Sequence, residues 1–270
     1  LPSFIPTFTT IMQMVFKKAR EPVVVQRLRR RRNAKELEHA EQIFAFADRM
    51  IAARRARGRE EEPQDVLGRL MWGIDPVTGE TLPEENLRMQ IVTLMIAGHE
   101  TTSALITWAI YYLTTHPEIM ASVQREIDEV LGRDISTTPT WEQVHKLDVL
   151  DRVFLESLRL SPILQGLMRR PREDAVLLGR YQVPANSDVV VLLSALHRNP
   201  LWWERADEFD PDRWLPEHRD KINPHAYYPF GLGQRACIGR GFALLEARAV
   251  LGMVLRAFDL IPDPNYVLHT

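Results

Sequence analysis

Apolar and polar positions alternate with a helical period over most of this chain. Residues 37–57 carry apolar side chains on one side of an expected amphipathic helix that ends near Gly58. Residues 86–113 are apolar almost all round, which predicts a long, central and buried helix. Residues 149–160 and 241–258 show two further helical periods. The pattern therefore predicts a mainly α-helical protein.

The helical period is lost in the third quarter of the chain. Residues 175–178 and 181–183 flank a Gly-Arg dipeptide, which predicts a β-hairpin. Residues 189–193 form an apolar run of strand length, and we expect a buried strand there. Residues 197–229 hold many Pro, Asp and Trp residues without a period, which predicts an irregular meander. The predicted fold class is mainly α with a small β portion, in one domain over residues 1–270.

Composition and charge exclude several classes of protein. A chain of 270 residues with 45% apolar content can bury a real core. The net charge of -2 gives no reason to expect nucleic acid as a partner. No apolar run approaches the roughly 18 residues of a membrane span. The basic run at residues 29–32 is interpreted as a solvated helix face. The chain begins at Leu1 without a Met, which suggests a fragment.

The single cysteine, Cys237, lies in a glycine-rich string at residues 230–239, which reads Phe-Gly-Leu-Gly-Gln-Arg-Ala-Cys-Ile-Gly. One cysteine excludes an internal disulfide. A thiol in a short loop just before a helix is a candidate axial ligand for haem iron. Gly231 and Gly239 permit tight turns and a close approach of the backbone to the ring. The alternative is a buried, inert cysteine, which is the common fate of a lone thiol.

Two neighbours of the thiol fit the same interpretation. Arg235 offers a planar fork that suits a haem propionate, and Phe230 can pack on the thiolate side of the ring. A rival interpretation is a dinucleotide fingerprint, because residues 231–236 match G-x-G-x-x-A. Residues 223–229 before the string contain two prolines in place of a buried strand, and no βαβ unit follows. We therefore reject the dinucleotide site.

Glu156 and Arg159 share a helix face at a spacing of three residues and can form an ion pair. Arg213, in the string Phe-Asp-Pro-Asp-Arg-Trp at residues 209–214, could complete a buried Glu–Arg–Arg cluster. Such a cluster would fasten the meander behind a haem and would be structural. The alternative is an isolated surface pair, which contributes little to stability.

A third motif, Ala-Gly-His-Glu-Thr-Thr, lies at residues 97–102 in the middle of the long apolar helix. Glu100 and Thr101 place an acid and a hydroxyl in apolar surroundings, where each needs a reason. An acid–alcohol pair beside bound O2 can relay protons to it. The alternative is that Thr101 bonds back to a helix carbonyl while Glu100 forms a salt bridge.

These motifs, in this order, resemble those of the cytochrome P450 family over essentially the whole chain. The likeness is closest to bacterial and fungal fatty-acid hydroxylases, some of which are fused to a diflavin reductase. The resemblance implies the cytochrome P450 fold. It also implies that the chain is incomplete at its N-terminus and at its extreme C-terminus, where the family has further helices and a last hairpin.

The resemblance implies a role for each matching residue. Cys237 is expected to be the proximal iron ligand, Arg235 to hold a propionate and Phe230 to shield the thiolate. Ala97 is expected to face the haem across the oxygen pocket, and Glu100 with Thr101 to manage protons there. Glu156, Arg159 and Arg213 are expected to form a structural triad. The segment expected to line the substrate channel contains Ile163, Leu164, Leu167 and Met168.

The family likeness implies a monooxygenase that inserts one atom of O2 into a C–H bond of an apolar substrate such as a fatty acid. The implied cofactor is haem b, with electrons from NAD(P)H through a flavin or iron–sulfur partner in a reductase domain or protein. We expect a cytoplasmic location, no nucleic-acid partner and no membrane span in this chain. Two alternatives stay open: a haem-binding or inert fragment without turnover, and a peroxygenase that uses H2O2.

Overall fold

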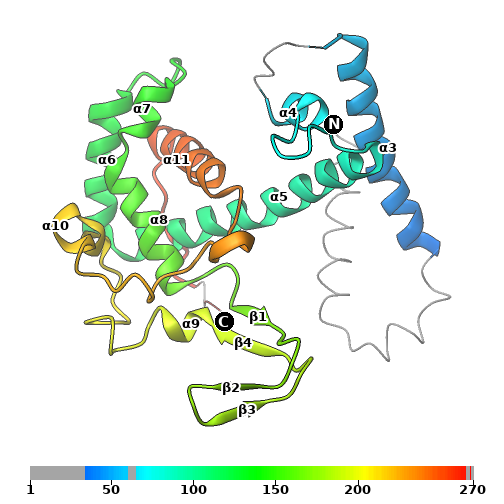
Figure 1. Ribbon diagram of the computed structural model, residues 1–270. Coiled ribbons are helices and arrows are strands. Elements are labelled where there is room, and N and C mark those ends of the chain that lie inside the picture. The colour runs from blue at the N-terminus through cyan, green and yellow to red at the C-terminus, as the bar shows by residue number, and fades with distance from the viewer. Residues whose placement is uncertain (1–33, 60–64, 266–267, 269–270) are drawn as a thin grey trace. The chain divides into compact units, whose positions relative to one another are not determined.

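The computed structural model describes residues 34–59, 65–265 and 268 (Figure 1). The chain forms two compact units, residues 1–99 and 100–270, and the boundary falls inside helix α5 (Glu84–Thr115). The sequence predicts a single domain over residues 1–270, and this domain organisation stays a prediction. The basic run at residues 29–32 lies outside the described residues.

The first unit contains α3 (Ala34–Ala56), α4 (Val66–Trp72) and the first part of α5. The helix predicted at residues 37–57 is therefore confirmed, and Gly58 follows it at a positive φ of 90°. Apolar side chains at helical spacing on α3 meet those on α5, because both helices present one apolar stripe. The buried core of this unit is Ile43, Ala47, Ile51, Leu87, Ile91 and Val92.

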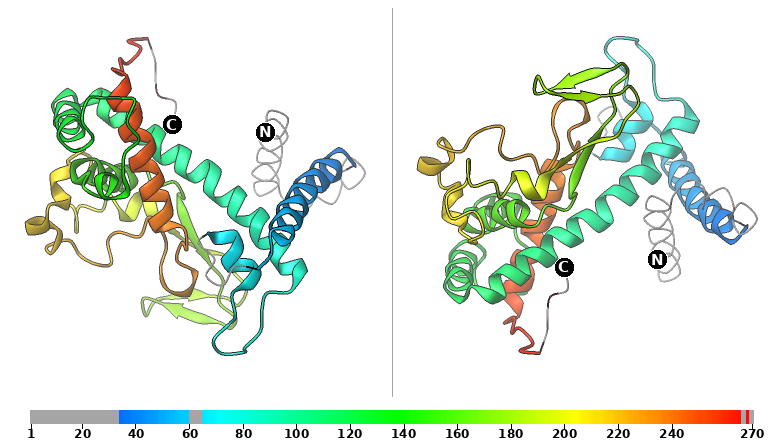
Figure 2. Two further views of the ribbon diagram at one scale, coloured as in Figure 1. Left: turned by 90° about the horizontal axis from the view of Figure 1, so that it is seen from above. Right: turned by 90° about the horizontal axis from the view of Figure 1, so that it is seen from below.

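The second unit is built around the second part of α5 and four further helices. They are α6 (Pro117–Leu131), α7 (Trp141–His145), α8 (Asp148–Leu160) and α11 (Arg240–Ala257). Helix α11 packs against α6 and α8, and Figure 2 shows it crossing beside them. The buried face of α6 repeats every three to four residues, at Met120, Val123, Ile127 and Leu131. The amphipathic patterns of the sequence thus produce one shared helical core.

Side chains fix where these helices begin. Thr140 and Gln143 form a reciprocal capping box at the start of α7. The start of α8 has a more distant partner: the carboxylate of Glu126 on α6 accepts the N–H groups of Val149 and Leu150 at 2.7 and 3.0 Å. Burial raises the pKa of Glu126, although these two N–H groups oppose the shift. The cap therefore also joins α6 to α8.

Four short strands form two antiparallel pairs. The predicted hairpin is confirmed as β2 (Ala175–Leu177) and β3 (Tyr181–Val183). The strand predicted at residues 189–193 is observed as β4 (Val189–Leu192), paired with β1 (Gly166–Arg169). Its predicted burial is wrong, since the side chains of Val190, Val191 and Leu192 are 47%, 44% and 56% exposed. A sheet of two strands has no further layer within the described residues to cover these side chains.

The meander after β4 contains more regular structure than expected. It begins with α9 (Leu193–Leu196) and holds a 3₁₀-helix, η2 (Pro211–Trp214), and α10 (Pro216–Arg219). Trp203 and Trp214 pack with Leu155 of α8 in a second, small apolar cluster. The meander is therefore fastened to α8 by aromatic side chains that show no periodic spacing in the sequence.

The predicted fold class, mainly α with a small β portion, is confirmed for the described residues. One detail differs, because α5 is not buried all round. Met89 and Leu94 are 47% and 37% exposed, while Leu105, Ala109 and Leu113 are buried. Apolar sequence on every face of α5 therefore does not translate into burial of every face within the described chain.

Candidate functional site

Cys237 lies in a short loop between a 3₁₀-turn, η3 (Gly233–Arg235), and the start of α11. It is a free cysteine and it is exposed, so the inert buried thiol is not what this structure contains. The Cys237 N–H donates to the carbonyl oxygen of Phe230 at 2.7 Å, which closes the loop on itself. Gly231 and Gly233 have φ of 76° and 68°, where a side chain would be strained.

Phe230 and Arg235 differ in burial within this loop. Phe230 is partly buried and packs against the main helical core, and the Arg240 guanidinium lies 5.6 Å from its ring centroid. Arg235 is exposed at the end of η3. Gly239 caps the N-terminus of α11, and a Cβ placed there would lie 3.8 Å from the Cys237 sulfur. One side of the loop is thus anchored in the core, and the thiol side is open.

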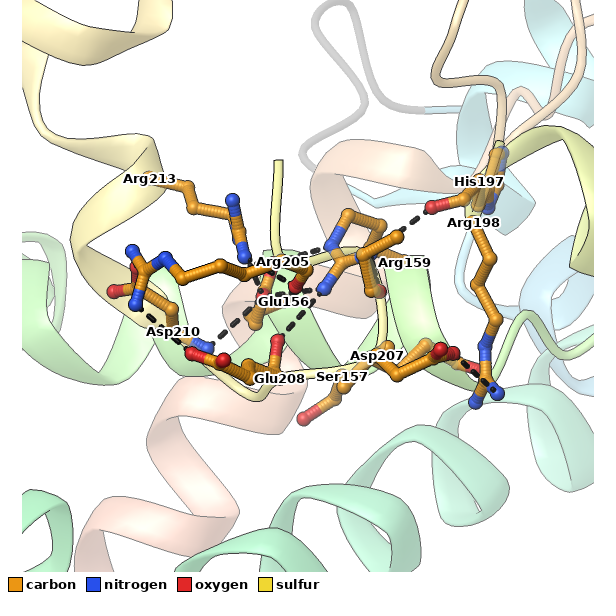
Figure 3. A network of polar contacts seen from close by, with 12 residues as sticks. Glu156, Ser157, Arg159, His197, Arg198, Arg205, Asp207, Glu208, Asp210 and Arg213 are labelled. Carbon is orange, nitrogen blue, oxygen red and sulfur yellow. Dashed lines mark hydrogen bonds and ion pairs between the residues drawn. The ribbon is translucent and has the colours of Figure 1, made fainter. Parts of the chain in front are cut away.

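Glu156 and Arg159 form a fully buried ion pair on α8 (Figure 3). Arg159 donates through Nε and Nη2 to the two carboxylate oxygens of Glu156 at 2.9 and 2.8 Å. Its remaining donors reach backbone carbonyls of the meander, those of His197 at 3.0 Å, Ala206 at 2.6 Å and Glu208 at 2.9 Å. All five guanidinium N–H groups therefore have an acceptor.

The structure brings Arg213 to the same carboxylate. Arg213 Nε lies 3.2 Å from Glu156 Oε1, and the Trp214 indole N–H donates to Glu156 Oε2 at 3.0 Å. The backbone N–H of Asp210 also donates to Oε1 at 3.0 Å. The three residues expected to form a triad are therefore in contact, and they hold α8 to the meander (Figure 3). Their structural role stays our prediction.

The segment that follows α8 places its apolar side chains on and before strand β1. Ile163 and Leu167 are partly buried, whereas Leu164 and Met168 are 55% and 58% exposed. Gly166 allows a close crossing with β4, because a Cβ there would lie 2.7 Å from a Val190 methyl carbon. These exposed apolar side chains suit contact with an apolar ligand.

The helix motif at residues 97–102 spans the boundary between the two units. Ala97 is exposed and belongs to the first unit, while Glu100 and Thr101 are partly exposed and belong to the second. Thr102 is 5% exposed, and its hydroxyl has no hydrogen-bond partner among the described residues. The roles predicted for Ala97, Glu100 and Thr101 stay predictions.

Sequence reasoning missed His197, which is fully buried beside this network. Its ring Nε2 accepts the backbone N–H of Tyr228 at 3.0 Å, just before the Cys237 loop. It also missed the backbone carbonyls that satisfy Arg159. Backbone acceptors carry no sequence signal, and a single histidine in an aperiodic segment gives none either.

The described residues offer neither a membrane-spanning helix nor a cluster of metal-ligating side chains. None of the described helices has both the length and the apolar character needed to cross a membrane. Within the described part of the chain, no three His, Cys, Asp or Glu side chains gather in a way that would hold a metal ion. The role of Cys237 as the single protein ligand of a haem iron stays a prediction.

Comparisons with known proteins point to one family. The family model described as Cytochrome P450 matches residues 1–268. A bifunctional cytochrome P450/NADPH–P450 reductase of Bacillus subtilis is 45% identical over 227 residues, covering 84% of this chain and 21% of that protein. A self-sufficient cytochrome P450 monooxygenase of Aspergillus niger is 35% identical over 269 residues, covering 98% of this chain and 24% of that protein.

A solved structure agrees. The crystal structure of the cytochrome P450DA heme domain aligns with a TM-score of 0.87 and 37% identity, over 98% of this chain and 56% of that chain. The expected fold is thereby confirmed. The chain spans about a quarter or less of the curated relatives named above and just over half of the solved domain. The motif order, the fold and the family match agree, and the chain belongs to the cytochrome P450 family.

Proposed function

We propose that the protein to which this chain belongs is a haem-dependent monooxygenase that inserts one atom of O2 into a C–H bond of an apolar substrate. The observation that carries this proposal is the Cys237 loop. An exposed thiol stands at the start of a helix, in a loop whose other side is anchored in the core through Phe230. The loop thus offers a fixed sulfur donor on an open face.

The residues around Cys237 fit a haem. Leu232, Ile238 and Phe242 are 56%, 94% and 65% exposed, although large apolar side chains are ordinarily buried. A flat apolar ring bound at the thiol would remove such side chains from water. The exposed guanidinium of Arg235 suits a propionate, since its planar fork matches a carboxylate. Cys237 as ligand and Arg235, Phe230, Gly231, Gly239 and Ala97 as haem contacts are our proposal.

Bound haem would supply the activation of O2, which a cysteine thiolate ligand promotes by pushing electron density towards the O–O bond. The chain's own residues have four tasks. The Cys237 loop holds the sulfur in place, the Glu156–Arg159–Arg213 network holds the meander before that loop, and apolar side chains exclude water. Glu100 and the hydroxyl of Thr101 would hold and pass protons on the oxygen side.

The proposed electron source rests on the names of the relatives, and the proposed substrate rests on the family likeness of the sequence motifs. One relative is named as a bifunctional cytochrome P450/NADPH–P450 reductase, and another as a self-sufficient cytochrome P450 monooxygenase. We propose electrons from NADPH through a flavin reductase and a fatty acid as substrate. Ile163, Leu164, Leu167 and Met168 would contact its chain, which agrees with their apolar character and with the exposure of Leu164 and Met168. The cytoplasmic location stays a prediction.

The test is a comparison of the haem-loaded chain with its Cys237→Ala variant. We expect the reduced wild-type chain with CO to give the red-shifted Soret band of a thiolate ligand, and Cys237→Ala to lose it. Gln234→Ala, an exposed neighbour in the same loop, should keep the band. With reductase, NADPH and labelled O2, a fatty acid should gain one labelled oxygen atom.

Three results would contradict the proposal. A thiolate-type band that persists in Cys237→Ala would remove Cys237 as the ligand. A normal band without any oxygen transfer would favour the alternative of a haem-binding fragment without turnover. Product formed from H2O2 alone would favour the peroxygenase.

A further inference from the structure

His197 is a buried histidine with no role in the function proposed above. It caps α9, where its backbone N–H donates to the Leu193 carbonyl at 2.8 Å. Its side chain is 0% exposed. A buried imidazole without a polar task would be costly, because its two nitrogens need partners that water can no longer supply. The contacts of His197 therefore need an explanation.

The ring of His197 acts as a hydrogen-bond acceptor. Nε2 accepts the Tyr228 backbone N–H at 3.0 Å, which assigns the proton of the neutral ring to Nδ1. The buried Nδ1 has no hydrogen-bond partner among the described residues, so the contact through Nε2 is the polar contact of the ring. The pKa of His197 is lowered to about 4, mainly by burial and in smaller part by the nearby Arg159 guanidinium. The backbone of Leu158 and Arg159 opposes this shift. The ring is thus neutral, and Nε2 stays available as an acceptor at ordinary pH.

The backbone of His197 belongs to the buried network. Its carbonyl oxygen accepts a hydrogen bond from Arg159 Nη1 at 3.0 Å (Figure 3). Arg159 is in turn held by both carboxylate oxygens of Glu156. One residue therefore touches the network through its main chain and Tyr228 through its side chain.

Tyr228 begins the chain segment that carries the thiol. The Tyr228 carbonyl accepts the N–H of Gly231 at 3.1 Å, and the Phe230 carbonyl accepts the N–H of Cys237 at 2.7 Å. The preceding residue is also fixed, since the Tyr227 hydroxyl donates to the Leu155 carbonyl at 2.8 Å. Three successive hydrogen bonds thus lead from His197 to Cys237.

We infer that His197 is a positioning residue for the Cys237 loop: its Nε2 holds the Tyr228 amide and joins the buried Glu156–Arg159 pair to the loop that presents the thiol. The inference deepens the proposed function, on which it rests for the importance of the thiol. It makes the hydrogen-bond acceptor, and not the volume of the ring, the property that matters. A residue that fills the space without an acceptor should therefore release the loop.

The experiment compares His197→Leu, which fills the space without an acceptor, with His197→Gln, whose side-chain oxygen can take the place of Nε2. Hydrogen exchange is measured at the amides of Tyr228, Gly231 and Cys237, relative to Val123 in α6 as a reference. We expect His197→Leu to exchange about tenfold faster or more at the three loop amides, as for a buried donor that loses its partner. His197→Gln should retain most of the protection.

Ser157→Ala is the matched control. Ser157 is 0% exposed on α8, and its hydroxyl donates to the Val153 carbonyl at 2.7 Å without touching the loop. Its removal should leave the loop amides unchanged. The inference is overturned if folded His197→Leu protects the loop as the wild type does, or if Gln and Leu accelerate exchange equally. Should His197→Leu not fold, His197→Asn, which is too short to reach Tyr228, takes its place against His197→Gln under the same two criteria.

A second readout separates this inference from the proposed function. In the haem-loaded chain, His197→Leu should shift the reduced CO complex from the thiolate-ligated to the thiolate-lost spectrum, and His197→Gln should reverse most of that shift. If Cys237→Ala shows that Cys237 is not the ligand, the proposed function fails. The amide exchange at Tyr228 still decides the role of His197.

Discussion

Arg159 is a buried cation, and the free-energy cost of its burial depends on the carboxylate of Glu156. Moving an ion out of water costs several kcal/mol, and only close pairing together with full hydrogen bonding offsets that cost. Glu156 meets this condition, because its two oxygens accept five hydrogen bonds from α8 and the meander. The pair is therefore stable only while it is intact, and its loss should be felt by every segment that it joins.

Glu156→Gln should lower the free energy of unfolding by about 3–5 kcal/mol, because it leaves the Arg159 guanidinium buried without a countercharge. Glutamine keeps the volume but replaces one carboxylate oxygen by an NH2 group, so the loss reports the charge together with the hydrogen bonds that this oxygen accepts. Urea denaturation of the chain measures the change.

Asp128→Asn is the control for this substitution. Asp128 accepts two hydrogen bonds from Arg133, but the side chain of Arg133 is 85% exposed. Surface ion pairs of this kind contribute about 1 kcal/mol or less. Equal losses for Glu156→Gln and Asp128→Asn would show that burial does not govern the Glu156–Arg159 pair.

The contact between β1 and β4 depends on a missing side chain. Gly166 pairs with Leu192, and a Cβ at residue 166 would lie 2.7 Å from Val190 Cγ1 and 3.2 Å from the Val191 carbonyl oxygen. Gly166→Ala should therefore lower the free energy of unfolding by about 1–3 kcal/mol, as for an overpacked site. Thermal unfolding of the chain measures the loss. Combining it with Val190→Ala should recover part of the stability, because the nearest clash is with a side chain.

Gly241→Ala provides the comparison for Gly166→Ala. Gly241 lies in the first turn of α11, and no described atom lies within 4 Å of a Cβ at that position. Alanine should be neutral there or stabilise the helix by up to about 1 kcal/mol. A Gly166→Ala variant as stable as the wild type would show that β1 can move away from β4.

The elements that the sequence predicts well are those with a local cause. The helix expected at residues 149–160 is observed as α8, because its apolar period and the following Pro162 both lie within the segment. Strand β1 was missed, since four residues without alternation give no signal and its partner lies more than twenty residues away. The burial of β4 was predicted wrongly for the same reason: composition does not tell whether another layer covers a strand.

At the scale of the whole molecule, the same distinction separates the two parts of the site. The Cys237 loop is contiguous in sequence, so its motif could be read directly. The support for that loop comes from His197, which is 31 residues from Tyr228 in the chain. This hydrogen bond uses a backbone N–H, which every residue but proline has. No spacing rule could therefore have identified it.

His197 contributes to the way in which the free energy of unfolding of the whole fold depends on pH. The ring has a pKa of about 4 when folded, against an ordinary value of 6.5. Between these values the unfolded chain binds the proton and the folded chain does not, so stability rises with pH. The contribution is fully present above pH 6.5 and is lost as the pH falls to about 4. The difference is equivalent to about 3 kcal/mol, at about 1.4 kcal/mol per pH unit.

His197→Gln should remove this part of the pH dependence. From pH 7 to pH 4 the wild type should lose about 3 kcal/mol more of its unfolding free energy than the variant, because glutamine cannot be protonated in this range. The carboxylates are the same in both chains, so their contributions to the pH dependence cancel in the difference. The groups that face the ring are also unchanged, namely Arg159, Tyr227 and the backbone N–H of Tyr228. Urea denaturation across this range measures it, with exposed His145→Gln as control. Parallel curves for wild type and His197→Gln would mean that the pKa of His197 is the same in the folded and the unfolded chain. The ring would then become protonated in the folded protein below about pH 6.5, and Tyr228 would lose its acceptor there.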